Sequence, residues 1–163
     1  MKNDSAWRQN SPAAFNCDKR PAVGSNGIIV ANHPLGAAAG AQILAAGGNA
    51  IDAAVASLLT LTVVEPMMVG LIGGGMMHIR TAEGRHIVID GQSQAPSAAV
   101  PDMFECVSDD IVRRLETKGR KNAVGPLSTA TAGNLAAWSK GLEAYGTLSL
   151  ADVIGPAIHY AEH

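Results

Sequence analysis

The longest apolar stretch of the chain, AIDAAVASLLTLTVV at residues 50–64, has the pattern of a buried helix. Its apolar side chains cover most of the circumference of a helix, which is typical of a central rather than a peripheral element. Asn49 is a favourable N-cap, and a carboxylate at the third helical position, Asp52, is favoured by the helix dipole. The pattern predicts a central helix from residue 50 to about residue 62, ended before Pro66.

Two elements are predicted before this helix. The β-branched run GIIVAN at residues 27–32 predicts a buried strand. An Ala-rich helix then follows over residues 34–46, with Pro34 in the first turn and Gly47 and Gly48 as a left-handed stop. Together, the two small-residue helices predict a closely packed pair.

After Pro66 the pattern changes to alternation. Met77, Ile79 and Thr81 alternate with polar residues before residues 82–84, and Ile87 and Ile89 alternate after them. This predicts a β-hairpin whose turn is Ala-Glu-Gly, and a loop from residue 92 to 101.

The remainder of the chain predicts three further helices. Ser108 caps the first, which carries Ile111, Val112 and Leu115 and stops at Gly119, before a basic linker at residues 118–126. The second has apolar residues at helical spacing, namely Leu135, Trp138, Leu142 and Tyr145. Ser149 and Asp152 form a capping box for the third, which Gly155-Pro156 either kinks or truly begins.

Composition narrows the class of protein. The chain has 163 residues, of which 47% are hydrophobic, 16% charged and only 4% aromatic, and this suits one folded domain of small-residue helices. The net charge of −2 gives no reason to expect nucleic acid or an anionic membrane as partner. The run at residues 53–64 is too short to span a bilayer.

Residues 1–20 are polar and lack the apolar segment of a secretory signal, so we expect a polar tail over residues 1–24 and a cytoplasmic protein. Cys17 and Cys106 lie far apart without metal-ligand spacing, and we expect two free thiols.

Few residues offer chemistry by themselves. The run GLIGGG at residues 70–75 follows a helix and opens a strand, the reverse of a phosphate-binding loop, and indicates tight backbone passage. His78 and His86 can face each other across the hairpin, and His159 and His163 are four apart on a helix. Two histidines supply only part of a usual metal site, so we expect neither a metal nor a cofactor. His33 is expected at a corner, and Asp109-Asp110 at a helix start, with structural roles.

A series of motifs resembles the gamma-glutamyltranspeptidase family. HPL, GGNAIDAAVA, VVEP, the glycine run and the next strand follow in order, and VIDGQSQAPSAAVPDMF and AGNLAAWSKGLEAYGTLSLADVIGPAIHYAE continue the likeness to residue 163. The resemblance covers residues 27–163 and is far more specific than a lone glycine motif.

The resemblance implies an N-terminal-nucleophile hydrolase with an α/β (α+β) fold, part of a four-layer αββα sandwich. Its members cleave themselves, and the new N-terminal Thr of the small subunit is the nucleophile, with its own amine as base. That Thr lies beyond residue 163; Thr60, Thr62, Thr129 and Thr131 do not match its motif. The chain thus resembles the N-terminal part of a large subunit (residues 25–163), whose partners are the rest of that subunit and the small subunit.

One departure from the family concerns substrate binding. The family carries an Arg in a D-x-R-E-x-A-P segment that grips the substrate α-carboxylate, whereas this chain reads DGQSQAP, with Gln92 at the Arg position and Ser93 at the acid. The leading hypothesis is a fragment of an amidohydrolase or acyltransferase, inactive alone, acting on a small amide or γ-glutamyl-like substrate other than glutathione. The alternative is a non-enzymatic α/β binding or assembly module that kept the scaffold.

Overall fold

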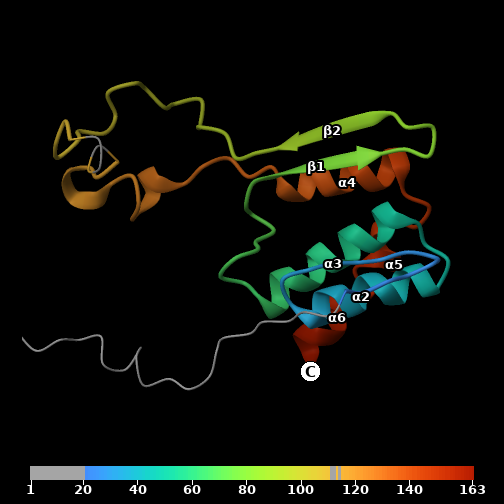
Figure 1. The fold of residues 1–163 in the computed structure, drawn as a ribbon. Helices are drawn as coiled ribbons and strands as arrows, with labels where there is room; N and C mark the ends of the chain where they lie inside the picture. Colours follow the sequence, from blue (N-terminus) through green and yellow to red (C-terminus); the bar gives the residue numbers. More distant parts are fainter. Residues whose placement is uncertain (1–20, 111–112, 114) are drawn as a thin grey trace, which may run out of the picture.

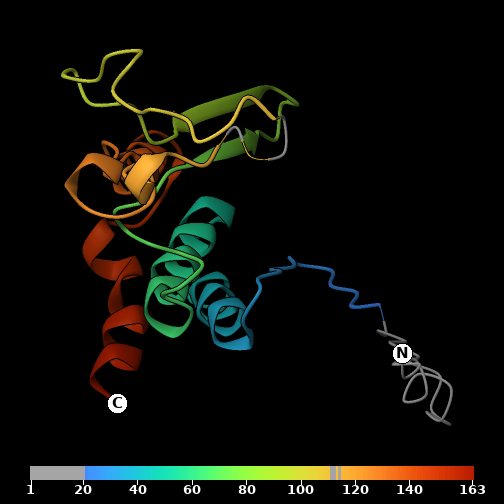
Figure 2. The same cartoon turned by 90° about the vertical axis from the view of Figure 1, so that its left-hand side faces the viewer.

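The computed structural model describes residues 21–110, 113 and 115–163, so residues 1–20 of the expected tail, with Cys17, lie outside the described part. A two-stranded hairpin forms one layer, and helix α4 (Asn134–Tyr145) packs against it. Figures 1 and 2 show the other helices on the far side of α4 from the hairpin. No helix in the described ranges is long and apolar enough to cross a membrane.

The two small-residue helices form as predicted. Helix α2 (Pro34–Ala45) begins with Pro34, and the side chain of His33 caps it by accepting the Leu35 N–H at 3.2 Å. Gly47 ends it with a φ of +96°, a conformation that glycine adopts without strain. Helix α3 (Ala50–Val64) starts with the predicted capping box of Asn49 and Asp52.

Helices α2 and α3 pack together because small residues line their contact. A Cβ added at Gly40 would lie 2.9 Å from the Ala53 carbonyl oxygen and equally close to Ile29, closer than real Cβ atoms come to other atoms. A larger residue at this position would therefore push the helices apart. The abundance of Gly and Ala in these two segments is the reason for their close approach.

The hairpin also forms as predicted. Strand β1 (Gly75–Arg80) pairs antiparallel with β2 (His86–Gly91), with Met77 opposite Ile89 and Arg80 opposite His86. Ile79 and Ile89 are buried on the inner face, against α4. The outer hairpin face carries the six alternate residues Met76, His78, Arg80, His86, Val88 and Asp90, all exposed.

The C-terminal helices follow their sequence signals. In α4, Trp138 and Leu142 are buried, whereas Leu135 is 41% exposed and points away from the core. Ser149 and Asp152 form the predicted capping box of the short α5 (Leu150–Val153). Helix α6 (Gly155–Glu162) then begins at Gly155, so the Gly155-Pro156 pair marks a new start.

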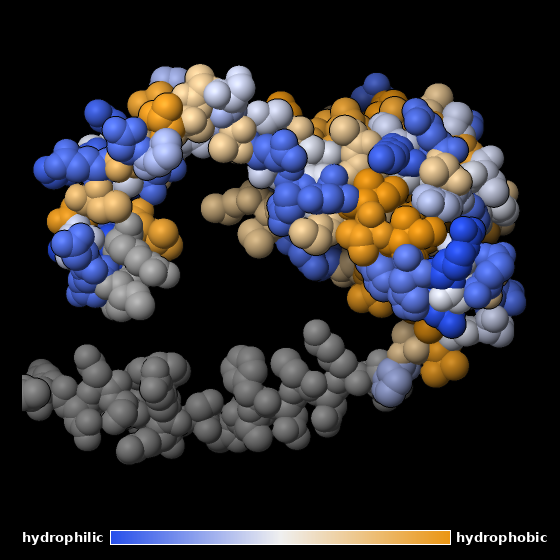
Figure 3. All heavy atoms as spheres, turned by 90° about the horizontal axis from the view of Figure 1, so that it is seen from above, coloured by the Kyte–Doolittle hydropathy of each residue, from blue (hydrophilic) through white to orange (hydrophobic). Residues whose placement is uncertain are grey.

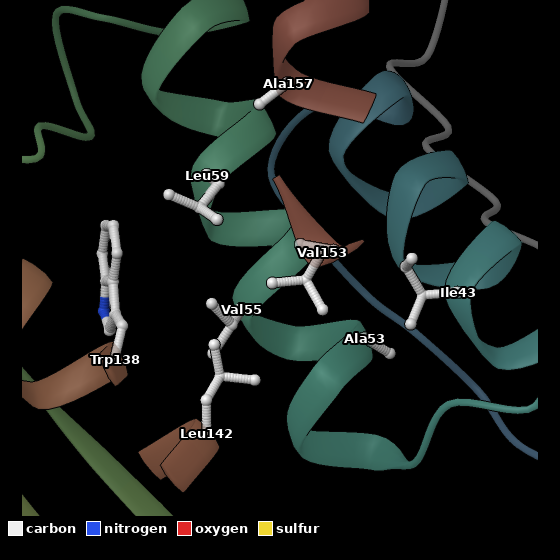
Figure 4. Packing of buried hydrophobic residues seen from close by; sticks show 9 residues of the cluster. Ile43, Ala53, Val55, Leu59, Trp138, Leu142, Val153 and Ala157 are labelled. Atoms are coloured by element: carbon white, nitrogen blue, oxygen red, sulfur yellow. The ribbon is translucent and has the colours of Figure 1, made fainter. Parts of the chain in front are cut away.

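The core gathers around α3, as Figure 4 shows. Its apolar face meets side chains from α2, α4, α5 and α6, and the cluster comprises Ile43, Ala53, Val55, Ala56, Leu59, Trp138, Leu142, Val153 and Ala157. Helix α3 therefore has few polar residues because other helices cover it on several sides. Helix α4 lies between this cluster and the hairpin.

A buried carboxylate joins the start of α3 to the turn after α4. Asp52 is fully buried, and its oxygens accept hydrogen bonds from the Thr147 N–H at 3.0 Å, the Thr147 hydroxyl at 2.6 Å and the Leu148 N–H at 3.2 Å. The Asn49 N–H donates at 2.8 Å as well. Burial raises the pKa of Asp52, but the hydrogen bonds from Thr147, Asn49 and Leu148 outweigh it and hold the pKa below its ordinary value.

The predicted buried strand at residues 27–32 is wrong. The segment has no strand partner among the described residues, and Ile28 and Val30 are 55% and 86% exposed. Only one side of it packs, through Ile29 against the helical core. A β-branched run becomes a strand only when a neighbouring strand supplies its hydrogen bonds, and the described part offers none here.

The predicted helix from Ser108 to Gly119 is wrong for the described residues, while Ile111 and Val112 lie outside them. Cys106 instead forms an antiparallel bridge with Thr117, which closes the segment as a loop. Ser108 does accept an N–H, but from Asp110 two residues on, in a turn. In Figure 1 the segment 95–130 projects away from the helices as an excursion.

Candidate functional site

Three segments far apart in the sequence meet at the start of β1. The glycine run at residues 73–75 lies between the loop after β2 and the first residues of α4. A Cβ added at Gly74 would lie 2.4 Å from the Ser93 backbone nitrogen and 3.0 Å from Gln92 Oε1. The run is therefore a tight backbone passage, as the sequence indicates, and only glycine fits at residue 74.

Asn134 stabilises this corner through hydrogen bonds. Its Nδ2 donates to the Gly70 carbonyl at 2.9 Å, and its backbone N–H donates to the Gly73 carbonyl at 3.1 Å. The Gly133 N–H donates to the same Gly73 oxygen at 3.0 Å. Asn134 is 8% exposed, so a buried amide and the first N–H groups of α4 fix the path of the glycine run.

Gln92 leaves β2 at this corner. Its backbone N–H donates to Asp90 Oδ1 at 2.9 Å, which turns the chain away from the strand. Its side chain is exposed, and its Oε1 faces the Gly74 backbone. The position that the resemblance assigns to substrate binding thus lies beside a rigid backbone and open to solvent.

Gln92 also lines a groove of about 660 Å³. Residues 87–91 of β2, Gln94 and the segment 131–133 form one side, and α4 forms the other with Ala136, Ala137, Lys140, Ala144 and Tyr145. Lys140 is exposed and is the cation from α4 in this lining, whereas Asp90 brings a carboxylate. The groove can therefore hold a small molecule that carries both polar and apolar groups.

The other candidate residues have structural surroundings. His78 and His86 do contact each other across the hairpin, with 2.9 Å between Nε2 and Nδ1. The rings of His159, in α6, and His163, directly after it, are stacked with their centroids 4.8 Å apart. Thr60 is fully buried, and the hydroxyl of the partly buried Thr62 donates to the Leu59 carbonyl at 2.7 Å within α3. Thr129 is exposed in the excursion, and Thr131 is exposed directly after it, where it pairs with Gln94 and lines the groove.

Asp109-Asp110 belongs to the loop rather than to a helix start. Cys106 is an exposed cysteine in the excursion, and Cys17 lies outside the described residues. Within the part of the chain that the structure describes, no three His, Cys, Asp or Glu side chains gather as metal ligands.

The sequence alone does not single out Asn134; it gives Ser93 only as the residue at the family's acid position and Gly74 only as part of the glycine run. The order of elements around the glycine run predicts tight packing of its backbone, which the structure confirms, but nothing in the sequence indicates that residues 92–93 and 133–134 are its neighbours. The one signal for Asn134 is its place in the motif AGNLAAW, directly before an apolar helical pattern.

Comparison with known proteins agrees with this arrangement. The sequence profile of the family described as Gamma-glutamyltranspeptidase matches residues 36–163. The chain is 59% identical over 150 residues to the "Acylase ACY 1 proenzyme" of Pseudomonas sp. (strain V22), covering 92% of this chain and 27% of that protein. It is 37% identical over 158 residues to the "Glutathione hydrolase proenzyme" of Bacillus subtilis (strain 168), covering 96% and 26%.

Among solved structures, the Helicobacter pylori gamma-glutamyltranspeptidase superposes with a TM-score of 0.75 at 33% identity, covering 85% of this chain and 38% of that one. The fold and these matches define the class as the N-terminal-nucleophile hydrolases. The chain belongs to the gamma-glutamyltranspeptidase family. It spans about a quarter of the length of the curated relatives just described.

Proposed function

We propose that this chain is the N-terminal part of an amidohydrolase or acyltransferase whose nucleophile, an N-terminal Thr, lies outside these 163 residues. The proenzyme names of the relatives and the share of their length that the chain spans support this proposal. The chain alone contributes one wall of a site and is inactive; its cytoplasmic location stays a prediction.

We further propose that the complete enzyme prefers an acyl group without the glutamyl α-carboxylate. The observation that carries this is the neutral amide of Gln92 on the groove at the family's Arg position. A guanidinium binds a carboxylate through two parallel charge-assisted bonds, whereas an amide offers no charge. The higher identity to the acylase than to the glutathione hydrolase agrees with this preference.

The size of the effect follows from hydrogen-bond energies. Bonds to a charged group contribute about 1.5–3 kcal/mol, and about 1.4 kcal/mol corresponds to tenfold in affinity. Without the Arg, a γ-glutamyl substrate should bind roughly 10- to 100-fold more weakly. Lys140, on the same groove, is the described cation best placed to compensate in part.

The test is Gln92→Arg in the full-length, self-processed enzyme. We expect kcat/KM on a γ-glutamyl anilide to rise roughly 10- to 100-fold, with little change on an anilide that lacks the α-carboxylate. Gln94→Arg is the matched control, since it adds the same charge on the same groove two residues further along. No gain with Gln92→Arg, an equal gain with Gln94→Arg, or an unaltered enzyme already efficient on glutathione would contradict the substrate proposal.

The class itself has a separate test. The purified 163-residue chain should hydrolyse neither γ-glutamyl anilides nor other amides, and extending the reading frame should reveal a Thr behind a cleavable junction. Turnover by the chain alone, lost on substitution of one of its own residues, would contradict the proposal. The binding-module alternative instead predicts cooperative folding of the chain and capture of a partner protein without any such Thr.

A further inference from the structure

The connection between α3 and β1, residues 65–74, presents apolar side chains that the described part of the chain does not cover. In Figure 1 this connection, in green, runs along the side of the molecule from the end of α3 to the start of β1. Met67 and Ile72 are 95% and 86% exposed, and Met68 and Leu71 are exposed as well. Apolar side chains gathered in this way are typical of a surface that meets other protein.

A carboxylate lies at the beginning of this connection. Glu65 directly follows α3, and its backbone carbonyl accepts the N–H groups of Met68 and Val69 at 3.0 and 3.1 Å. The Glu65 side chain is only partly exposed, and its Oε2 atom is buried without a hydrogen-bond partner among the described residues. A buried acceptor without a donor is destabilising, so this atom calls for a partner that the described residues do not supply.

The described helices offer Glu65 no cation. The sequence contains neither Lys nor Arg from residue 21 to residue 79. Lys140 is the one Lys or Arg within α4, α5 and α6, and it lines the groove beside β2. Glu65 forms no ion pair with any described residue. A protein partner for this carboxylate therefore has to come from another part of the enzyme.

The surface is also hollowed where the connection turns toward β1. A pocket of about 360 Å³ lies there, between the glycine run and side chains that include Leu58, Val69 and Trp138. Apart from the Asn134 amide, its lining side chains are apolar. This hollow can receive an apolar side chain from a segment that covers the connection.

We propose that residues 65–72 form an interface for a segment of the same enzyme that lies outside residues 1–163. This segment brings an apolar side chain to the hollow and an Arg or Lys that pairs with Glu65 Oε2. A cation is needed rather than a neutral N–H, because the cover removes water from an ionised carboxylate, and a buried charge has to be paired.

The length of the relatives agrees with this occupant. The chain spans 27% and 26% of the acylase and glutathione hydrolase proenzymes, so most of such an enzyme is available to supply the segment. The inference rests on the proposal that the chain is part of a longer enzyme, and it is independent of the acyl substrate.

The first test locates the covering segment in the full-length, self-processed enzyme. The photo-cross-linking residue p-benzoylphenylalanine replaces Met67, and the peptides that it labels are identified by mass spectrometry. We expect a labelled peptide from outside residues 1–163 that contains or adjoins a Lys or Arg. The same group at Glu143 should not label that peptide, because α4 ends at Tyr145, whose carbonyl accepts from Asn49 at the opposite end of α3.

The second test examines the ion pair in the same enzyme. Glu65→Gln keeps the size of the side chain but removes its charge, and it should lower Tm by roughly 3 °C or more because the partner cation is left unpaired. Glu143→Gln, at an exposed site, is the matched control and should change Tm by less than about 1 °C. Replacing the cross-linked Lys or Arg with Met should lower Tm as Glu65→Gln does, and the double variant should be no worse than either single variant.

The two tests fail separately from the proposed function. Labels confined to residues 21–163, labels between two copies of the enzyme, or no label at all would overturn the interface, even where a longer reading frame with its Thr is found. Additive losses in the double variant, or an unchanged Tm for Glu65→Gln, would overturn the ion pair. If Glu65→Gln prevents folding, the cross-link decides, since that enzyme keeps Glu65.

Discussion

The helical core and the outer hairpin face differ in how far the chain covers them. Val55 and Val153, in the core around α3, are 0% exposed, whereas Met76 and Val88, on the outer hairpin face, are 65% and 60% exposed. Figure 3 looks onto this side of the molecule and shows apolar side chains gathered between polar and charged ones. One region is closed by its own helices, and the other presents apolar groups to water.

The difference shows which apolar surfaces are covered by the described residues themselves and which are left uncovered. Helix α3 finds its cover in α2, α4, α5 and α6, all within the described residues. The hairpin is covered by α4 on its inner face only, and no further described strand pairs with either of its edges. Large exposed apolar patches and open strand edges mark surfaces that meet other protein, so we expect the rest of a longer protein to cover this face.

The largest expected effect is on the closed region. Leu59→Ala removes a buried side chain from the core and leaves a cavity, so the free energy of unfolding should fall by about 3 kcal/mol. Val88→Ala, the matched change on the outer hairpin face, should alter it by less than about 0.5 kcal/mol. Urea unfolding followed by circular dichroism measures both, and equal losses would refute the contrast between the two regions.

The next effect concerns the buried carboxylate. Asp52→Asn places an amide donor where several N–H and O–H groups already donate, and should cost about 2 kcal/mol of unfolding free energy near neutral pH. Ser149→Ala, which removes an exposed cap two residues beyond Thr147, should cost about 1 kcal/mol and serves as the comparison.

The pH dependence of that loss has a definite sign. The folded pKa of Asp52 is lowered, so its stabilisation is fully present above the ordinary value of 3.8 and is lost as pH falls through the lower folded pKa. The difference between the unaltered chain and Asp52→Asn should therefore shrink below that value. A difference that stays constant from neutral pH to the acid transition would refute the assigned cause.

The smallest effect on stability is expected for substitutions on the outer hairpin face, which should instead change the solubility of the chain. We expect the isolated chain to aggregate through the outer hairpin face, and Met76→Thr with Val88→Thr should raise its solubility while changing the free energy of unfolding by less than about 0.5 kcal/mol. Light scattering against concentration measures this. If the unaltered chain is monomeric and melts sharply, the outer hairpin face does not cause aggregation and the prediction is wrong.

The elements with local signals could be predicted from the sequence. Helices α2 and α3, the hairpin turn and the Ser149–Asp152 capping box depend on residues within a few positions of one another. The segment 27–32 could not be predicted in the same way, because its state depends on a strand partner that the described part lacks. The helix expected after Ser108 gave way to the Cys106–Thr117 bridge, a pairing that periodicity does not reveal.

The residues of the candidate site also fall into those that a sequence motif locates and those that only the folded structure brings together. Gln92 was found because a motif places it, and the structure puts it on a groove. Its neighbours at Gly74 and Asn134 come from segments about 20 and 40 residues away, and their meeting depends on tertiary packing.

The contacts of Asp52 also bear on the order in which parts of the chain can pack during synthesis. Its partner Thr147 lies 95 residues further along the chain, whereas α2 and α3 are adjacent in sequence. On a ribosome adding roughly 5–20 residues per second, the newly made helix pair waits about 5–20 s before Thr147 has been added. Throughout that interval Val55 and Leu59 lack the cover of α4, α5 and α6, so the nascent pair exposes apolar side chains of the kind that chaperones bind.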